Sequence, residues 1–89
     1  MDLFIKLLIL NLLGGDKMKA YVLIKTTGGK ARDVLDKIRA MDGVEEASGT
    51  YGSFDIIAKM EAKDLASLVI DEIRRLDGVV DTNTLIVAL

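Results

Sequence analysis

The sequence predicts one α+β domain with the element order β-α-β-β-α-β. Two segments with the apolar spacing of amphipathic helices each lie between runs rich in β-branched residues. The two halves also repeat: residues 34–44 and 69–79 are identical at seven of eleven positions with an offset of 35, so we expect them to form the same structure. Each copy ends in Asp-Gly-Val, which is typical of a helix end, a glycine and a following strand.

The composition excludes several classes of protein. The chain has 89 residues, 51% of them hydrophobic and 29% charged, which is a globular composition and fits a single domain. It contains no cysteine and no histidine, which removes disulfides, thiolate metal sites and the commonest general base. The formal net charge of −2 gives no electrostatic basis for binding nucleic acid or a membrane surface. A domain this small often gains stability by forming oligomers.

The first half predicts a strand, a helix and a second strand. Residues 19–26 are rich in β-branched and aromatic side chains, and Gly28 and Gly29 end this strand. Apolar residues then recur at helical spacing, at Ala31, Val34, Leu35, Ile38 and Met41. The second strand is expected over residues 44–51.

The second half follows the same plan. Tyr51-Gly52-Ser53 predicts a turn, and the third strand is expected over residues 54–61. Apolar residues mark the second helix, at Leu65, Leu68, Val69, Ile73 and Leu76. Asp64 precedes that helix, where a carboxylate stabilises the positive helix end. The last strand is expected over residues 79–88.

Two right-handed crossovers joined by a hairpin make a ferredoxin-like plait: a four-stranded antiparallel sheet with both helices on one face. Strict alternation places Leu85 and Val87 toward the helices, with Val22, Ile24, Ile56 and Ala58. The open face is then expected to carry Tyr21, Leu23, Lys25, Asp55, Ile57, Lys59, Thr82, Thr84 and Ile86. About half of these residues are apolar, so we expect a homodimer formed through the sheet faces.

Residues 1–17 are expected to stand apart from the domain at 18–89. The run from Met1 to Leu13 is apolar but interrupted by Lys6 and Asn11, too short to span a membrane and without the features of a secretory signal. The codons of Gly14-Gly15-Asp16 are compatible with a purine-rich ribosome-binding sequence ahead of a start at Met18. Residues 1–17 are therefore either a translated leader or a genuine extension that packs on a subunit surface. The absence of a spanning segment or signal leads us to expect a cytoplasmic protein.

Several segments contain residue types that are found in binding or catalytic sites, but most of these segments are better explained by a structural role. Thr26–Lys30 could hold a phosphate but lacks the spacing of glycine-rich phosphate loops. The carboxylates are spread out, and Glu45 and Glu46 should point to opposite sides of a strand, so we expect no metal, no cofactor and no catalytic residue. Tyr21 and Tyr51 could stack on RNA bases, but the basic signature of such proteins is absent.

Asp55 is the most specific candidate for a functional residue in the sequence. It is a lone acid at the entrance of a strand, behind a turn in which Gly52 permits a positive φ. Such a carboxylate can receive an ammonium group or stabilise the hairpin by accepting neighbouring N–H groups. The residues alone leave both interpretations open.

These features together resemble the C-terminal effector domain (RAM domain) of Lrp/AsnC transcriptional regulators. The resemblance rests on the loop Gly52-Ser53-Phe54-Asp55, on Ile56-Ile57 after it, and on the closing run Asp-Gly-Val-Val-Asp-Thr-Asn-Thr-Leu-Ile-Val. It covers Met18 to Leu89. Full-length members also carry an N-terminal helix-turn-helix, which residues 1–17 cannot encode. The chain therefore resembles a stand-alone RAM protein, for which direct DNA binding is not expected.

The resemblance implies an effector-binding and oligomerisation domain rather than an enzyme. Domains of this family form dimers through their sheets, as a dimeric α+β barrel, and the dimers join into rings, often of eight subunits. Amino acids bind between the dimers near the Gly-x-Tyr/Phe-Asp loop. By resemblance the ligand-binding residues are Tyr51, Gly52, Ser53, Phe54, Asp55, Thr82 and Thr84. The chain would modulate transcription or metabolism through assembly, and full-length Lrp/AsnC relatives could join its rings.

The alternative is a small enzyme or metabolite-handling protein on the same dimeric barrel plan. With no histidine or cysteine, only Asp55, Tyr51, Tyr21 and the lysines could supply its chemistry. A catalytic residue is expected in a deep pocket of one protomer with a strongly shifted pKa, whereas an effector site is expected between subunits.

Overall fold

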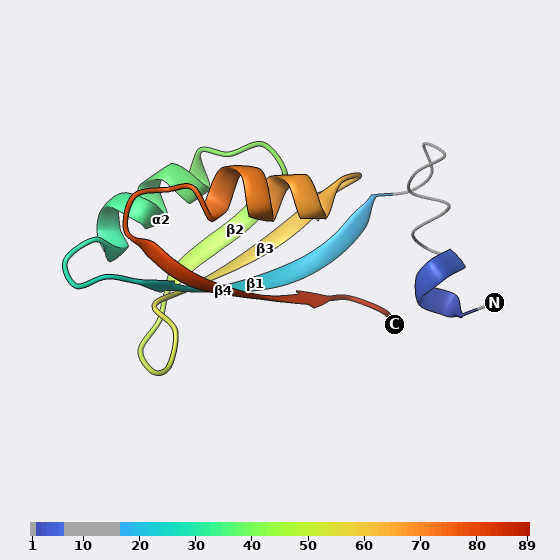
Figure 1. Cartoon of the computed structure of the whole chain (residues 1–89), viewed down its shortest axis with the longest axis horizontal. Helices are drawn as coiled ribbons and strands as arrows, with labels where there is room; N and C mark the ends of the chain where they lie inside the picture. Colours follow the sequence, from blue (N-terminus) through green and yellow to red (C-terminus); the bar gives the residue numbers. More distant parts are fainter. Residues whose placement is uncertain (1, 7–16) are drawn as a thin grey trace.

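The strands form the predicted four-stranded antiparallel sheet, and both helices cover one of its faces (Figure 1). The computed structural model describes residues 2–6 and 17–89. The element order is β1 (Met18–Thr26), α2 (Ala31–Arg39), β2 (Val44–Gly49), β3 (Ile56–Ala62), η1 (Ser67–Ile73) and β4 (Val79–Ile86). The strand order β2-β3-β1-β4 puts β1 and β3 at the centre, as the ferredoxin-like plait requires. The interpretation of residues 1–17 as leader or extension falls mostly on residues outside the described ranges.

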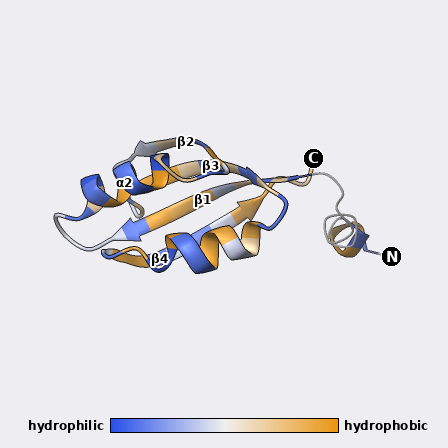
Figure 2. Cartoon of the chain, turned by 90° about the horizontal axis from the view of Figure 1, so that it is seen from above, coloured by the Kyte–Doolittle hydropathy of each residue, from blue (hydrophilic) through white to orange (hydrophobic). Residues whose placement is uncertain are grey.

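The hydrophobic core lies between the sheet and the helices. Strands β1 and β3 supply alternate residues to it, Ala20, Val22, Ile24, Ile56, Ala58 and Met60, each with no exposed surface. The helices cover them with Val34, Leu35 and Ile38 from α2 and with Leu68, Val69 and Ile73 from η1. Figure 2 shows hydrophobic stretches on the central strands and, along both helices, hydrophobic stretches that alternate with hydrophilic ones. The predicted helix faces are therefore confirmed.

The second helix departs from an ordinary α-helix. The N–H of Arg74 donates to the carbonyl of Val69, five residues earlier, at 2.9 Å, which is the spacing of a π-helical turn. Its start is as predicted: the Asp64 carboxylate accepts the N–H of Ser67 at 3.0 Å and so satisfies a free donor of the first turn.

The two copies of the internal repeat also share features of backbone conformation. Gly43 and Gly78, which end the two copies, have φ values of +90° and +98°. Each copy then carries a β-bulge one residue after its valine, because the register shifts at Glu45 in β2 and at Val80 in β4. The two bulges are 35 residues apart, the same offset as the repeat.

The bulge at Val80 overturns the predicted faces of β4. Strand β4 pairs Thr82 with Ile24, Thr84 with Val22 and Ile86 with Ala20, so these residues lie on the helix side of the sheet. Leu85 pairs with Tyr21 and lies on the open face instead. Because Val80 is an extra residue in β4, the residues that follow it face the opposite side of the sheet from the side predicted by alternation from Val79.

Gly78 gives the first stability prediction. A Cβ atom at this position would lie 2.6 Å from Cβ of Lys30, and the positive φ disfavours any side chain. We expect Gly78→Ala to destabilise the protein by more than about 1 kcal/mol and to lower Tm by several degrees. Gly28→Ala is the matched control, because nothing lies within 4 Å of its Cβ position. Thermal unfolding checks both variants, and equal Tm values would contradict the prediction.

Candidate functional site

The predicted ligand loop is a turn that projects beyond the sheet. It follows β2 and extends to the side of the sheet opposite the helices (Figure 1). Its base is closed by Thr50, whose N–H donates to the carbonyl of Asp55 at 2.8 Å and whose hydroxyl donates to the carbonyl of Phe54 at 2.9 Å. Gly52 has a φ of +125°, as the turn requires, and the Tyr51 side chain is fully exposed. The loop is thus well defined at its base and open at its tip.

Asp55 connects this loop to the end of β1 through hydrogen bonds. Its Oδ2 accepts the backbone N–H of Thr26 at 2.8 Å and the Thr26 hydroxyl at 3.1 Å, while its own N–H donates to Ile24 at 2.9 Å. The two Thr26 hydrogen bonds lower the pKa of Asp55, and the charge of Lys25 adds to this effect. Asp55 therefore accepts neighbouring N–H and O–H groups, as one of its two interpretations predicted; these groups belong to β1, so the bonds hold the β2–β3 hairpin against that strand.

Thr82 and Thr84 lie away from the loop. They belong to β4, which is separated from β3 by β1, and they face the helix side, while the tip of the loop projects on the open side. One protomer does not bring them together with Tyr51, Gly52, Ser53 and Phe54. A site that uses all seven predicted residues would need more than one subunit.

A hollow of about 410 Å³ lies on the helix side, next to Asp55. The prediction of Asp55 on the open face is therefore wrong, because β3 begins only at Ile56 and its alternation does not extend to Asp55. Helix α2 contributes Ala31, Arg32, Leu35 and Arg39, and the hairpin of β2 and β3 contributes Gly49, Asp55 and Ile56. The two arginines are not among the site residues predicted from the sequence. Their separation of seven residues, two helical turns, is the signal that could have placed them on one face.

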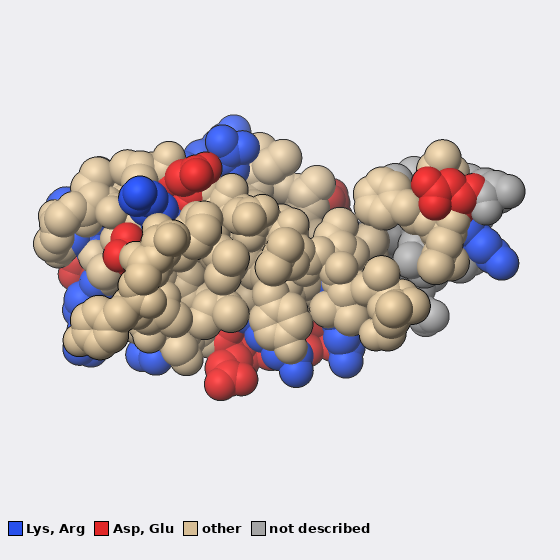
Figure 3. Space-filling model, turned by 90° about the horizontal axis from the view of Figure 1, so that it is seen from below, with Lys and Arg blue, Asp and Glu red and all other residues tan. Residues whose placement is uncertain are grey.

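The open sheet face has an uncharged centre. Tyr21, Leu23, Ile57 and Leu85 occupy it, and Tyr21 and Leu85 are 38% and 51% exposed. Figure 3 views the molecule from this side: uncharged atoms cover the middle, and charged side chains gather mainly along the margins. An apolar sheet face of this kind usually contacts a partner.

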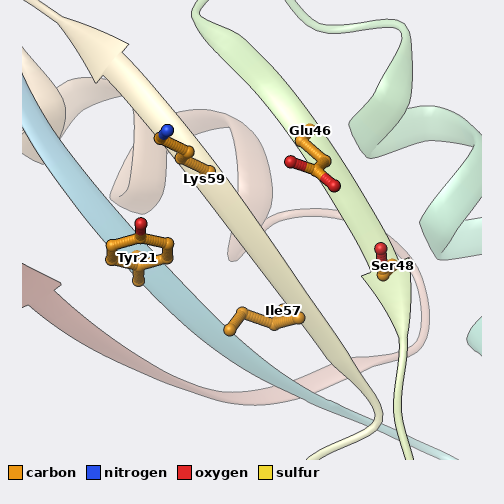
Figure 4. A pocket seen from close by; sticks show the side chains of 5 residues that line it. All are labelled: Tyr21, Glu46, Ser48, Ile57 and Lys59. Carbon is orange, nitrogen blue, oxygen red and sulfur yellow. The ribbon is translucent and has the colours of Figure 1, made fainter.

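A shallow hollow of about 160 Å³ lies on the same face (Figure 4). Strand β1 contributes Tyr21, β2 contributes Glu46 and Ser48, and β3 contributes Ile57 and Lys59. This volume is below the roughly 300–1,000 Å³ of typical small-molecule sites.

The prediction that Glu45 and Glu46 point to opposite sides of a strand is wrong, because the bulge in β2 lies at Glu45. Both reach the open side: Glu46 lines the shallow hollow beside Lys59, and Glu45 lies 3.7 Å from Nζ of Lys59. A hydrogen bond with the Glu61 side chain and the charges of Lys59 and Lys19 lower the pKa of Glu45. Lys59, which lies on the central strand β3 and pairs with Tyr21, thus balances these acids beside the uncharged centre of the open face.

The remaining stretches have structural roles. In the Thr26–Lys30 turn, the N–H of Thr27 donates to Gly78 and that of Lys30 donates to Thr27, so these amides are not free for a phosphate. Across residues 2–6 and 17–89, no group of three acids gathers as a metal site would require. Within the same residues, no helix is long and apolar enough to cross a membrane.

The lowered pKa of Asp55 predicts a pH-dependent stability. Because its folded value lies below the ordinary 3.8, the stabilisation is fully present above about pH 4 and is lost as pH falls through the folded value. Asp55→Asn removes the charge, so we expect wild type to have the higher Tm at pH 7 and the difference to narrow below pH 4. Asp42→Asn, in an exposed turn, is the control. A Tm difference that is constant from pH 7 to pH 2.5 would contradict this assignment.

The element order and the sheet define a class of fold, the ferredoxin-like α+β domain. The profile of the Lrp/AsnC ligand binding domain matches residues 19–88, so the chain belongs to this family. A curated relative is the HTH-type transcriptional regulator LysM of Sulfurisphaera tokodaii, 33% identical over 75 residues. The match covers 81% of this chain and 54% of that regulator, so the chain spans about half the length of this relative.

Two solved structures support the same assignment along nearly their whole length. FFRP-DM1 is 36% identical with a TM-score of 0.76, and the match covers 80% of this chain and 99% of that chain. The hypothetical protein PHS023 of Pyrococcus horikoshii is 37% identical with a TM-score of 0.74, and the match covers 81% and 90%. Chains made of little more than this domain therefore exist among solved structures.

Proposed function

We propose that this chain is an amino-acid-binding and oligomerisation domain that modulates transcription or metabolism through assembly, without enzymatic activity or direct contact with DNA. Its family is a family of ligand-binding domains, and its curated relatives are named transcriptional regulators. The formal charge of −2 is unfavourable for binding the phosphate backbone of DNA. Its place of action is the cytoplasm, where full-length relatives could join its assemblies.

One observation carries the assembly part of the proposal: the uncharged open face lies on the side to which the Tyr51–Ser53 turn projects. A second copy that packs its sheet on this face comes into contact with the turn. Residues of the turn can then line a site between subunits, and larger rings can follow by contacts between dimers. This arrangement is consistent with a turn that is fixed at its base and exposed at its tip.

Asp55 is the proposed acceptor for the ammonium group of the amino acid. Its Oδ2 is used by Thr26, and Oδ1 remains available for a charge-assisted hydrogen bond. The N–H groups of the turn and, from other subunits, the hydroxyls of Thr82 and Thr84 supply donors for the ligand. Asp55 thus has two roles, one in the hairpin and one in the site.

A thermal-shift screen of the common amino acids at millimolar concentration tests ligand binding. A ligand at 100 times its Kd stabilises the folded state by about 2.7 kcal/mol, which raises the Tm of a domain of this size by roughly 10 °C or more. We expect at least one amino acid to do so. A screen in which none of them shifts Tm would contradict the proposal.

Asp55→Asn then separates the two roles of Asp55. The amide oxygen can still accept from Thr26, but the charge that attracts the ammonium group is gone. We expect the variant to fold and to bind the best amino acid at least about tenfold more weakly in calorimetric titration. Equal affinities would remove Asp55 from the ligand site and leave it only its role in the hairpin.

A further inference from the structure

The hollow beside Asp55 contains opposite charges that do not neutralise one another. Arg32 and Arg39 line it from α2, and Asp55 lines it from the hairpin. Among the described residues, neither arginine lies within 4.0 Å of a carboxylate oxygen, since the ion pairs found there involve Lys30, Lys59 and Arg75. The hollow therefore holds one acid and two guanidinium groups without an ion pair between them.

The arginines are placed so that their side chains can converge. They are seven residues apart on α2, which puts them on one face about two turns from each other, with Leu35 between them. Arg39 is held in place because its Nε donates to the carbonyl of Ala47 at 2.9 Å. This bond leaves the terminal nitrogens of Arg39 to face a ligand, and guanidinium groups bind carboxylates through two parallel hydrogen bonds.

The charges in the hollow select one kind of ligand. Asp55 with two arginines gives a local charge of +1, which is complementary to a ligand with one ammonium group and two carboxylates. A neutral amino acid has only one carboxylate and would leave one guanidinium group without a partner. The volume of about 410 Å³ is within the usual range of small-molecule sites.

We propose that this hollow binds an acidic amino acid, aspartate or glutamate, with its ammonium group on Asp55, its α-carboxylate on Arg39 and its side-chain carboxylate on Arg32. This assignment rests on the proposed function, because it names the class of amino acid that the domain takes. It keeps Asp55 as the acceptor for the ammonium group and adds Arg32 and Arg39 as the partners of the carboxylates, beside any donors that other subunits supply. Leu35, which keeps a small exposed surface in the hollow, contacts the short apolar part of the ligand between its charged ends. Aspartate and glutamate are then preferred over asparagine and glutamine, from which they differ only by the second carboxylate.

Calorimetric titration of the full chain with these four amino acids, and with succinate and glutarate, tests the assignment. We expect aspartate or glutamate to bind at least about tenfold more tightly than its amide, and more tightly than the dicarboxylates, which lack the ammonium group. Arg32→Gln should weaken binding of the acidic amino acid about ten- to hundredfold and change binding of the amide little. Arg32 is exposed and makes no hydrogen bond through its side chain among the described residues, so this variant should fold.

Arg74→Gln is the matched control, because it removes the same charge from an exposed position directly after η1. Equal binding of acid and amide, or an unchanged Kd in Arg32→Gln, would overturn the assignment and leave the proposed function standing. Equal binding of glutarate and glutamate, or of succinate and aspartate, would overturn the role of the ammonium group and with it the amino-acid class. If no amino acid binds, the proposed function fails together with this inference.

Discussion

Ile57→Asp is expected to convert the assembled protein into monomers. Ile57 lies at the centre of the open sheet face, beside Leu23 and across from Ser48. If a second sheet packs on this face, the variant buries a carboxylate with no partner in the interface. The penalty for a buried unpaired charge is several kcal/mol, which corresponds to a dissociation constant at least about 100-fold higher.

Ile70→Asp is the matched control for this experiment. It makes the same change on η1, on the helix side of the molecule, where the isoleucine is 53% exposed. Light scattering after size-exclusion chromatography should give a reduced mass for Ile57→Asp and the wild-type mass for Ile70→Asp. A wild-type mass for Ile57→Asp would place the interface elsewhere on the molecule.

The second large effect concerns the core. Ile24 has no exposed surface, lies on the central strand β1 and belongs to the cluster of buried residues between the sheet and the helices. Ile24→Ala removes buried apolar atoms and leaves a cavity, which costs about 2–5 kcal/mol. For a domain of this size we expect Tm to fall by roughly 10–40 °C.

Ile70→Ala gives the comparison for the core variant, since it makes the same change at an exposed position. Surface substitutions of this kind usually change stability by less than about 0.5 kcal/mol. Thermal unfolding at one protein concentration compares the Tm of the core variant with the Tm of the surface variant. Similar losses in the two variants would contradict the packing of Ile24 described here.

The element order could be predicted from the sequence because periodicity and the repeat indicated the same structure. Val34, Leu35 and Ile38 are spaced for a helix, and the alternating residues of β1 and β3 enter the core as expected. The faces of β4 were predicted wrongly, because the bulge at Val80 changes the phase of the strand. Apolar residues at Leu85, Ile86 and Val87 fit either face, so the sequence contains no signal that reveals the bulge.

The candidate site was predictable only in part. The loop and Asp55 could be identified from their local sequence, but the hydrogen bonds from Thr26 connect residues 29 positions apart. Such a contact depends on which residues of β1 and β3 lie opposite one another, and neither strand shows this when its sequence is considered alone. The hollow with Arg32 and Arg39 depends in addition on the orientation of α2 over the sheet. Both features become visible only when the elements are packed together.

Sedimentation equilibrium of the wild-type chain at micromolar concentration tests most directly the claim that this domain acts by assembly through its open sheet face. The chain has a mass of 9.7 kDa. We predict a mass of twice this value or a larger even multiple, as expected for dimers or rings of dimers. A mass of 9.7 kDa would contradict the account, because the uncharged sheet face and the loop beside it would then have no second subunit with which to form a site.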